Sequence, residues 1–383
     1  MAITEPTEQQ AATTGGRMGK TPYETWVGRQ GVPVIEGYGV TDVNHHEFGR
    51  WERLGCNAYF ILLKGMEGIT GMYVAEIPAG SATNQMQQLY EEVIYVMEGR
   101  GSTTLAAPDG QSHQFEWGPG SLFAIPLNTP HRLFASGQRV RYVAFTTAPL
   151  VFDLFYNEDF IYNTPFRFAE RFDGSPAWFQ RDVHHAPTAR GMGIWETNFI
   201  PDLKKMVIDA AEVKGRGVQL TQFEIAGNSL IGHLAKWPVG QYHKAHHHGG
   251  GAILYIVQSE GFTLMWPNEL GLRPYENGHG DEVVRVDWQP HSVLSPPTGW
   301  YHQHCNTGKE PALQLAMRNG SSKFPFGVRK AQQRKGVLTS TREGGTMIEY
   351  EDEDPAVRKM YLEALERNGV AIETGEWQGT DGA

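Results

Sequence analysis

The sequence predicts an all-β protein with two strand-rich units in tandem, preceded by an extended N-terminal arm and followed by a C-terminal helix. The first observation is composition, because 45 Gly and 22 Pro among 383 residues favour short strands joined by tight turns. The second is a repeated cadence of short β-branched and aromatic runs, such as GMYVAEIPAG and AILYIVQSEG. The third is an internal repeat that relates the two halves of the chain.

The length sets the number of units, because 383 residues exceed one typical domain and are short for three. Each half is long enough to bury a core of its own. The cadence of strands and turns divides the chain into five parts. They are a disordered N-terminus and extended arm over residues 1–47, an N-terminal unit over 48–150, a connector over 151–205, a C-terminal unit over 206–325, and a tail with one helix over 326–383.

The two ends of the chain differ from the units between them. Residues 21–44 are rich in Gly, Pro and aromatics without a helical period, which predicts an extended arm lying on another surface, such as a dimer interface. Near the C-terminus, Asp354 is a good N-cap, Pro355 suits the first helical position, and Gly369 can end the helix. Its apolar face would comprise Val357, Tyr361, Leu362 and Leu365.

Charge and cysteine content narrow the class of partner. A formal charge of −10 argues against binding nucleic acid or an anionic membrane, and favours a small-molecule substrate. The N-terminus lacks the apolar core of a signal peptide, and no stretch approaches the roughly 18 apolar residues of a membrane span. Since Cys56 and Cys305 are the only cysteines, no disulfide framework is expected, and we expect a cytoplasmic protein.

The internal repeat is carried by three matched segments. EIPAG, ending at Gly80, matches KWPVG, ending at Gly240, and EVIYVMEGRG matches AILYIVQSEG at the same offset of 160 residues. Farther along, the Pro-x-Asn-x-x-His segment ending at His131 matches the Pro-x-Gly-x-x-His segment ending at His302, at an offset of 171. The second copy therefore contains eleven additional residues, which we place in the loop NELGLRPYENGHG.

Two motifs of the second copy resemble those of the cupin superfamily. Gly240 is followed after five residues by His246-His247-His248, and later Pro297-x-Gly299-x-x-His302 leads to Asn306. The resemblance implies that each unit is a double-stranded β-helix, the cupin or jelly-roll barrel, and that a metal ion lies inside it. Two positions depart from the family pattern: Ala252 stands where a glutamate belongs, and His291 where the second motif begins with glycine. The first copy keeps that glycine as Gly120.

Three histidines are the candidate metal ligands: His246, His248 and His302. On a strand, residues i and i+2 face the same side, so His246 and His248 would point together into a barrel, where His302 joins them. Neutral imidazoles suit Fe, Zn, Cu and Ni, and our first choice is Fe(II), with Mn, Ni or Zn as alternatives. Taken alone, HKAHHHGGG is also typical of a solvated loop or an adventitious metal trap. The place of His302 after Pro-x-Gly favours a functional site.

Five further residues are candidates for the surroundings of the ion. His304 lies two residues beyond His302, so we expect it to face inward and to orient a ligand, act in acid–base chemistry or replace a ligand; the alternative is a satisfied interior histidine. His243, Tyr242 and Trp300 could line the mouth or simply pack. The first two are grouped with His304 as catalytic candidates, and Trp300 with Arg318 as substrate-binding candidates; a structural ion pair is the alternative for Arg318. By alternation, Cys305 should point outward.

The first copy has lost the ligand set. Met86, Gln88 and Glu92 occupy the positions of His246, His248 and Ala252, and His131 is the one matching histidine. Because Met and Gln are poor ligands for a borderline divalent ion, we interpret this unit as structural. Its alternative role is to hold a small polar ligand through Glu92 and His131.

The resemblance suggests a metal-dependent oxidoreductase. Cupins with three histidines and no acid include thiol and β-diketone dioxygenases, and the gentisate and salicylate dioxygenases are bicupins of similar length, although their metal typically lies in the first barrel. Our first hypothesis is therefore a non-haem Fe(II) dioxygenase that uses dioxygen to cleave a small aromatic or enolisable acid. The alternative is a Mn-, Ni- or Zn-dependent lyase, isomerase or decarboxylase, although the oxalate-decarboxylase pattern has the glutamate that Ala252 replaces. A second alternative is a non-catalytic ligand-binding bicupin, and in every case we expect a homodimer or higher homo-oligomer.

Overall fold

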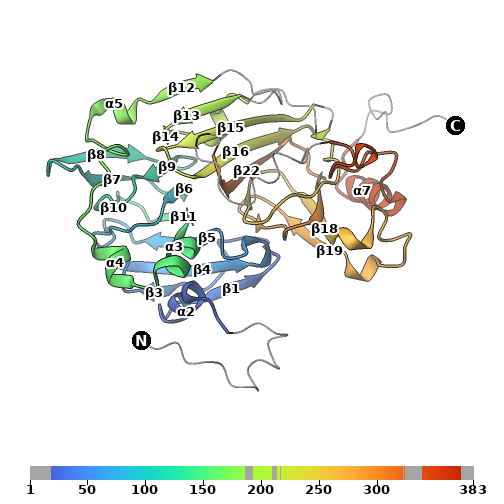
Figure 1. The fold of residues 1–383 in the computed structure, drawn as a ribbon. Coiled ribbons are helices and arrows are strands. Elements are labelled where there is room, and N and C mark those ends of the chain that lie inside the picture. Colours follow the sequence, from blue (N-terminus) through green and yellow to red (C-terminus); the bar gives the residue numbers. More distant parts are fainter. Residues whose placement is uncertain are drawn as a thin grey trace.

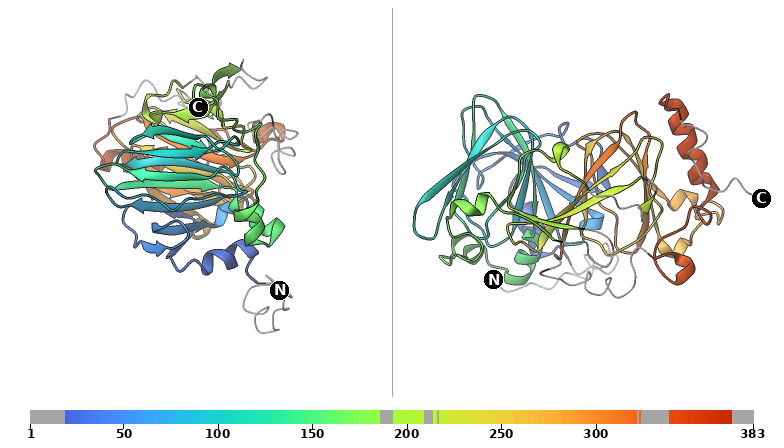
Figure 2. Two further views of the ribbon diagram at one scale, coloured as in Figure 1. Left: turned by 90° about the vertical axis from the view of Figure 1, so that its left-hand side faces the viewer. Right: turned by 90° about the horizontal axis from the view of Figure 1, so that it is seen from above.

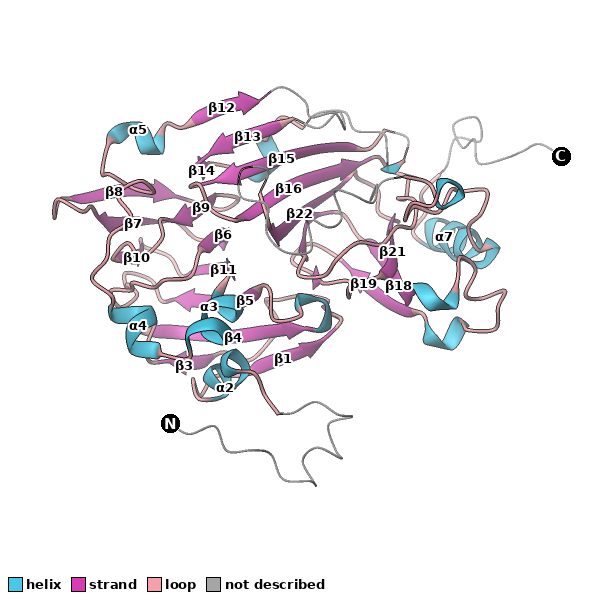
Figure 3. Cartoon of the chain, viewed as in Figure 1, coloured by secondary structure: helices cyan, strands magenta, loops and turns pink. Residues whose placement is uncertain are grey.

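The chain folds into two β-barrels that lie side by side in space (Figure 1). The computed structural model describes residues 19–185, 193–208, 214–215, 217–321, 323 and 339–371, and all structural statements concern these residues. Each barrel combines one eight-stranded sheet with one three-stranded sheet, and strands predominate over helices throughout (Figure 3). The predicted all-β fold with two barrels is confirmed.

The N-terminal barrel is built mainly from residues 34–146. Its large sheet has the order β1 (Val34–Gly37), β4 (Cys56–Leu63), β5 (Gly71–Ile77), β11 (Val140–Thr146), β6 (Glu92–Glu98), β9 (Leu122–Ile125) and β14 (Phe199–Ile200), with β3 (Gly49–Trp51) beside β4. Its small sheet has the order β10 (His131–Ala135), β7 (Gly101–Ala106) and β8 (Ser112–Trp117). Strand β7 alternates buried and half-buried residues, as expected where one sheet face lines a core.

The C-terminal barrel repeats this arrangement. Its large sheet has the order β12 (Asp182–His185), β13 (Ile194–Thr197), β15 (Gln219–Ile225), β16 (Leu230–Trp237), β22 (Ala312–Asn319), β17 (Ile253–Gln258), β20 (Val293–Leu294) and β2 (Gly39–Val40). Its small sheet has the order β19 (Val284–Trp288), β18 (Gly261–Pro267) and β21 (Trp300–Asn306). The connection between β18 and β19 spans residues 268–283, against 107–111 between β7 and β8, so the eleven additional residues lie where the repeat predicts them.

The two large sheets face each other, and the small sheets lie outside them (Figure 2). One apolar cluster fills each barrel, and a third, between the large sheets, joins the barrels. Tyr95 and Tyr255 meet edge to face in this third cluster, with ring centroids 5.0 Å apart. Aromatic pairs in this geometry bury large apolar areas, so the two barrels are joined by a continuous hydrophobic core.

Short strands from outside each barrel extend the large sheets. The arm contributes β1 to the N-terminal sheet and β2 to the C-terminal sheet, so it crosses between the two barrels of the same chain. The arm is not extended throughout, because helix α2 (Pro22–Gly28) begins it with a capping box formed by Thr21 and Glu24. Helices α3 (Ala148–Phe155), α4 (Glu158–Asn163) and α5 (Pro176–Phe179) and strands β12 to β14 occupy the region predicted as a connector. Most of the predicted disordered N-terminus lies outside the described residues.

Helix α7 (Pro355–Arg367) covers the outer face of the small C-terminal sheet. Asp354 caps it by accepting a hydrogen bond from the Ala356 amide, as predicted. Tyr361 and Leu365 are buried against that sheet, and each contributes about 1.5–3 kcal/mol by burial of apolar surface. The prediction for Leu362 was wrong: its side chain is 41% exposed, and Ala364 occupies the buried face instead.

Short 3₁₀ helices occur in the connections. They are η1 (Lys64–Met66), η2 (Leu203–Lys205), η4 (Asn268–Leu270), η5 (Gly280–Glu282) and η6 (Thr341–Glu343). Both cysteines are buried and free, and Cys305 faces outward from its barrel into the cluster under α7, as alternation predicts. None of the described helices has the length and apolar content needed to cross a membrane.

Candidate metal centre

The structure brings three histidines together inside the C-terminal barrel. His246 and His302 exchange two backbone hydrogen bonds, of 3.2 and 2.9 Å, across an isolated antiparallel bridge, although 56 positions separate them in the chain. The ring of His302 lies 4.5 Å from that of His246 and 4.6 Å from that of His248, centroid to centroid. The potential ligand atoms of all three rings lie within 4.8 Å of one another.

Backbone carbonyl groups fix the tautomer of each ring. The Nδ1 atom of His246 lies 3.0 Å from the carbonyl oxygen of Lys244, that of His248 lies 2.7 Å from the Gly249 oxygen, and that of His302 lies 3.1 Å from the Trp300 oxygen. A carbonyl only accepts hydrogen bonds, so each Nδ1 carries the proton of the neutral imidazole. The three Nε2 atoms therefore keep their lone pairs, and the carbonyl partners orient the rings in the way seen around bound metals.

Burial keeps the three imidazoles neutral. It lowers the pKa of His248 to about 4 and holds the pKa values of His246 and His302 well below the ordinary value. Within the described part of the chain, no Asp, Glu or Cys joins the group, and the buried Ala252 occupies the position of the family's glutamate. Three neutral nitrogen donors with no carboxylate fit a divalent transition-metal ion and leave its charge uncompensated.

His304 lies beside this group with its Nδ1 atom bound to a buried hydroxyl. The Oγ1 atom of Thr263 lies 2.8 Å from Nδ1 of His304 and accepts a hydrogen bond of 3.1 Å from Nε1 of Trp288. Since Thr263 already accepts from Trp288, its own proton is available for Nδ1 of His304. This assignment places the imidazole hydrogen of His304 on Nε2. Burial lowers the pKa of His304 to about 3, so the ring is neutral.

His243 is a second interior histidine, deeper in the same barrel. Its ring packs 4.4 Å from Trp237 and 5.6 Å from His304, between ring centroids. It is 1% exposed, and neither ring nitrogen bonds to any residue that the structure describes. Burial lowers its pKa well below the ordinary value, so this ring too is neutral. The structure thus places His243 inside the barrel rather than at its mouth.

Of the two alternatives for Tyr242, the structure shows packing and not a place at the mouth of the barrel. Its hydroxyl donates to a carboxylate oxygen of Glu353 at 2.5 Å, and its ring packs on Tyr350 and Tyr361 outside the barrel. The reason is an irregular register. Tyr242 pairs with Cys305, and His246 pairs with His302. Four positions separate the first members of these two pairs, but only three separate the second members. One extra residue in a ladder turns the following side chains to the other face, so Tyr242 points outward while His246 points inward.

Trp300 and Arg318 lie at the same end of the barrel as the three histidines. Trp300 packs on Tyr38 from the arm with ring centroids 5.4 Å apart, and the Lys64 ammonium lies over that tyrosine ring. Arg318 is the next-to-last residue of strand β22 and lies two positions after the interior residue Ala316, so it faces the inside of the barrel. Burial is the main cause of the lowered pKa of His248, and the positive charge of Arg318 is one of the smaller causes that lower it further. The guanidinium group therefore lies close enough to act electrostatically on the three histidines.

Lys214 is a further charged residue near the three histidines, and its place there was not predicted from the sequence. Its carbonyl oxygen accepts a hydrogen bond of 3.0 Å from the amide of Lys244, two residues before His246. Burial, and then repulsion by Arg318, lower the pKa of Lys214 to about 8, so it is still protonated at neutral pH. A single lysine outside any recognisable motif carries no pattern, which is why the sequence did not indicate it.

The N-terminal barrel has a different polar cluster at the matching position. Glu92 binds the Tyr73 hydroxyl at 2.5 Å and the Gln88 amide at 3.1 Å, and its carboxylate lies 3.7 Å from Nε2 of His131. Burial raises the pKa of Glu92 to about 7 and lowers that of His131 to about 4. The carboxyl and the imidazole are therefore already engaged with this barrel's own side chains.

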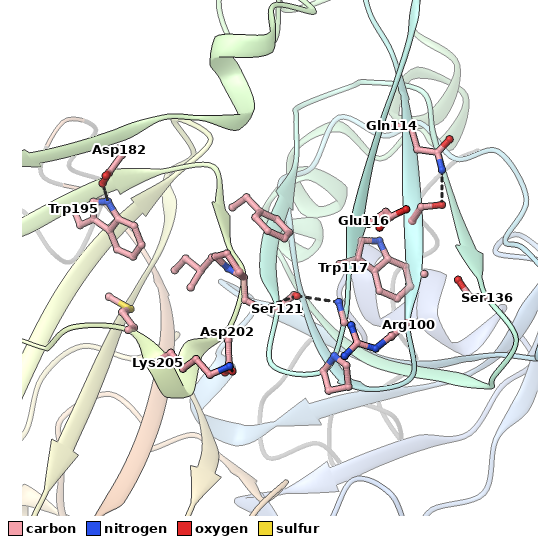
Figure 4. A pocket seen from close by; sticks show the side chains of 18 of the residues that line it. Arg100, Gln114, Glu116, Trp117, Ser121, Ser136, Asp182, Trp195, Asp202 and Lys205 are labelled. Carbon is pink, nitrogen blue, oxygen red and sulfur yellow. Dashed lines mark hydrogen bonds and ion pairs between the residues drawn. The ribbon is translucent and has the colours of Figure 1, made fainter.

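A groove of about 1040 Å³ lies outside both barrels, between β8 and the segment from β12 to residue 207 (Figure 4). Its polar side chains are mostly paired with one another: Trp195 donates to Asp182 at 2.6 Å, and Lys205 lies 3.1 Å from Asp202. Its lining includes no pair of histidines. We therefore place the candidate site at the three converging histidines and not in this groove.

Comparison with known proteins identifies the first barrel. Residues 34–153 match the family described as Cupin. The N-terminal barrel is a cupin domain. The C-terminal barrel repeats the strand order of this domain. The family match covers the barrel that lacks the three histidines.

Solved structures that are similar to this chain include oxalate decarboxylases. A variant of the Bacillus subtilis enzyme is 13% identical, with a TM-score of 0.48, covering 74% of this chain and 78% of that one. The Lactobacillus farciminis enzyme, in a formate complex, is 12% identical, with a TM-score of 0.48, covering 80% and 92%. No curated protein matches the chain. Identity this low does not transfer a reaction or a substrate.

Proposed function

We propose that this bicupin is a metal-dependent enzyme whose C-terminal barrel binds a divalent ion through His246, His248 and His302 and acts on a small anionic substrate. The observation that carries the proposal is the set of three Nε2 lone pairs, all oriented by backbone carbonyls toward one another. A bound ion would supply Lewis-acid polarisation of a substrate oxygen.

The charges around the three histidines support an anionic substrate. Lys214 and Arg318 are both cationic at neutral pH, and the three metal ligands contribute no negative charge. A carboxylate of the substrate would satisfy the positive charge at the mouth of the barrel, and Trp300 with Tyr38 would offer it an aromatic wall. Small organic acids are therefore the substrate class that we propose.

His304 favours a lyase, isomerase or decarboxylase reaction of an enolisable acid. With its hydrogen on Nε2, the neutral imidazole can donate a hydrogen bond to a substrate oxygen on which negative charge develops. Thr263 and Trp288 hold the ring in this tautomer. Such a reaction could use Mn, Ni or Zn, because it requires no change in the oxidation state of the ion.

The second candidate is the Fe(II) dioxygenase of our first hypothesis. Three facial protein ligands favour it, because they leave three octahedral positions, enough for a chelating acid and dioxygen. Elemental analysis and reconstitution separate the two reactions. Carbon dioxide release or isomerisation with Mn or Zn supports the first, and oxygen uptake that requires Fe(II) supports the second.

Two experiments test the proposal: measurement of divalent-ion binding and removal of the positive charge of Lys214. We expect one equivalent of divalent ion per chain, and Lys214→Met should raise the KM for acids more than it lowers kcat. Neutral amides of the same acids serve as the control, since they should not respond to the loss of the ammonium group. A protein that binds no ion, or keeps its ion after all three histidines are replaced by alanine, would exclude this site.

A further inference from the structure

A connection in the N-terminal barrel contacts both segments that carry metal ligands in the C-terminal barrel. It joins β4 to β5, comprises residues 64–70, and lies on the side facing the C-terminal barrel (Figure 3). Within it, Glu67 adopts a left-handed backbone conformation with φ of 50°. The two oxygens of its carboxylate accept hydrogen bonds from Thr298, from the amide at 2.6 Å and from the hydroxyl at 2.5 Å. Thr298 lies in the Pro-x-Gly turn that leads to His302.

Thr298 also connects this turn to the segment that follows His248. Its hydroxyl donates to Glu67 and accepts a hydrogen bond of 2.6 Å from the amide of Gly250. The amide of Gly299 donates to the carbonyl of His248 at 3.0 Å. Because a hydroxyl has one proton to donate, the carboxylate of Glu67 fixes the direction of this chain of hydrogen bonds. The spacing of the two ligand-bearing segments therefore depends on a residue of the other barrel.

Close backbone contacts hold the same connection in place. The amide of Gly251 donates to the carbonyl of Gly65 at 2.7 Å, and the Thr70 hydroxyl donates to the carbonyl of Gly251 at 2.9 Å. A Cβ atom on Gly65 would lie only 2.2 Å from the carbonyl oxygen of Ser295, so this close approach requires glycine. These contacts position Glu67 opposite Thr298.

The contact is specific to the copy with the three histidines. At the offset of 171, Thr298 corresponds to Leu127 of the N-terminal barrel, which has no hydroxyl to take part in such a chain. The loss of metal ligands in the first copy is thus accompanied by the loss of this polar contact. The N-terminal barrel supplies the acceptor of this contact, the carboxylate of Glu67 in the connection between β4 and β5.

We propose that Glu67 is a positioning residue for the metal centre, and that the N-terminal barrel serves the C-terminal one by holding the segments of His248 and His302 at ligand spacing. This inference rests on the proposed metal site. Glu67 and Thr298 are exposed, so their hydrogen bonds add little to the free energy of unfolding. Their effect should instead be seen in metal affinity, as for other residues that orient metal ligands.

The test compares two carboxylates that both join the barrels. Glu67→Gln presents an amide to the Thr298 donors, and Glu91→Gln is the matched control. Glu91 accepts hydrogen bonds of 2.8 Å from the amide and hydroxyl of Ser229 and from the amide of Leu230, a segment without metal ligands. Co(II) affinity is measured on the full chain by competition with a chelator, and the visible absorption of bound Co(II) reports the ligand geometry.

We expect Glu67→Gln to weaken Co(II) binding about tenfold and to change the visible spectrum, by the effect typical of residues that orient metal ligands. Thr298→Val should reproduce both changes, and Thr298→Ser, which keeps the hydroxyl, should restore wild-type behaviour. Glu91→Gln should lower the unfolding midpoint while leaving the Co(II) affinity and spectrum unchanged. Wild-type affinity and spectrum in Glu67→Gln would overturn the inference alone. A wild-type chain that binds no Co(II) would overturn the proposed function together with it.

Discussion

The two barrels share a scaffold but differ in what they enclose. In the first, Trp117 donates to the hydroxyl of Thr103 at 2.9 Å, and in the second, Trp288 donates to Thr263 at 3.1 Å, at positions related by the repeat. His131 is likewise bound through Nδ1 to the carbonyl two residues before it, as His302 is. The backbone contact that orients His302 is therefore also present in the barrel that lacks counterparts of His246 and His248.

The difference between the barrels lies in a few side chains at one place. Glu92 with Tyr73 and Gln88 forms a closed hydrogen-bonded cluster in the first barrel, and the second has Ala252 and the histidines instead. A buried carboxyl costs little when it is hydrogen-bonded and protonated, so such a cluster can replace a metal site without loss of the fold. The same barrel architecture thus accommodates either set of side chains, and the proposed metal chemistry depends on those few residues.

The largest effect should come from removing His302, and the matching His131 of the first barrel provides the control. His302→Ala should weaken binding of a divalent ion by about 100-fold or more, because it removes a direct ligand, whereas residues that only orient ligands cost about 10–100-fold. His131→Ala should leave the affinity unchanged. Isothermal titration of both variants checks this pair, and equal losses would mean that the first barrel also contributes to metal binding.

Glu92→Gln should reveal a pH-dependent cost of the buried carboxyl. The folded-state pKa of Glu92 is raised to about 7 by burial, so the folded chain retains a proton that the unfolded chain releases near its ordinary pKa of 4.5. The wild-type protein should therefore lose about 3 kcal/mol of stability from this group as pH rises from 5 to 8, and the glutamine variant should not.

Urea unfolding of both proteins at several pH values checks this difference. The lowered pKa of His131 has the opposite effect, with stability lost as pH falls from 6.5 toward about 4, but His131 is present in both proteins and its contribution cancels in the difference. A constant difference between them across the range would show that Glu92 is not a buried neutral acid.

Ala252→Glu should make the second barrel more like the four-ligand pattern of the family. An added carboxylate favours Mn over softer ions, so we expect about a tenfold gain in Mn(II) affinity. The reciprocal variant Glu92→Ala in the first barrel should not change metal content. Competition between Mn(II) and Zn(II), followed by elemental analysis, checks the pair; an unchanged preference would show that position 252 does not face the ion.

The smallest effect should come from the shared Thr–Trp contacts. Thr103→Val and Thr263→Val each remove a hydroxyl from a buried tryptophan donor and should each lower stability by about 1–2 kcal/mol. Only Thr263→Val should alter His304, whose Nε2–H tautomer can be followed by ¹⁵N NMR. An Nδ1–H tautomer in the wild-type protein would contradict the assigned role of this histidine.

Local and periodic features were predictable from the sequence. The repeat offsets located the eleven additional residues between β18 and β19, and the capping pattern at Asp354 located the start of α7. The spacing of His246, His248 and His302 predicted that they form one cluster, because the motif spacing and the internal repeat both selected these three residues. These features depend on nearby residues or on a comparison of the chain with itself.

Features that depend on distant contacts were not predictable. Tyr242 faces outward because one extra residue interrupts the ladder between its bridge and that of His246, and no local pattern reveals such a register change. The exchange of β2 and β14 between the large sheets, and the contact of Glu67 with Thr298, join segments far apart in the chain. Lys214 is near the histidines only because the barrel closes.

Anomalous diffraction from crystals grown with Co(II) tests the central claim most directly. We expect one peak per chain, inside the C-terminal barrel, with the Nε2 atoms of His246, His248 and His302 about 2.1 Å from it. A peak beside Glu92 and His131, or no peak at the three histidines, would contradict it.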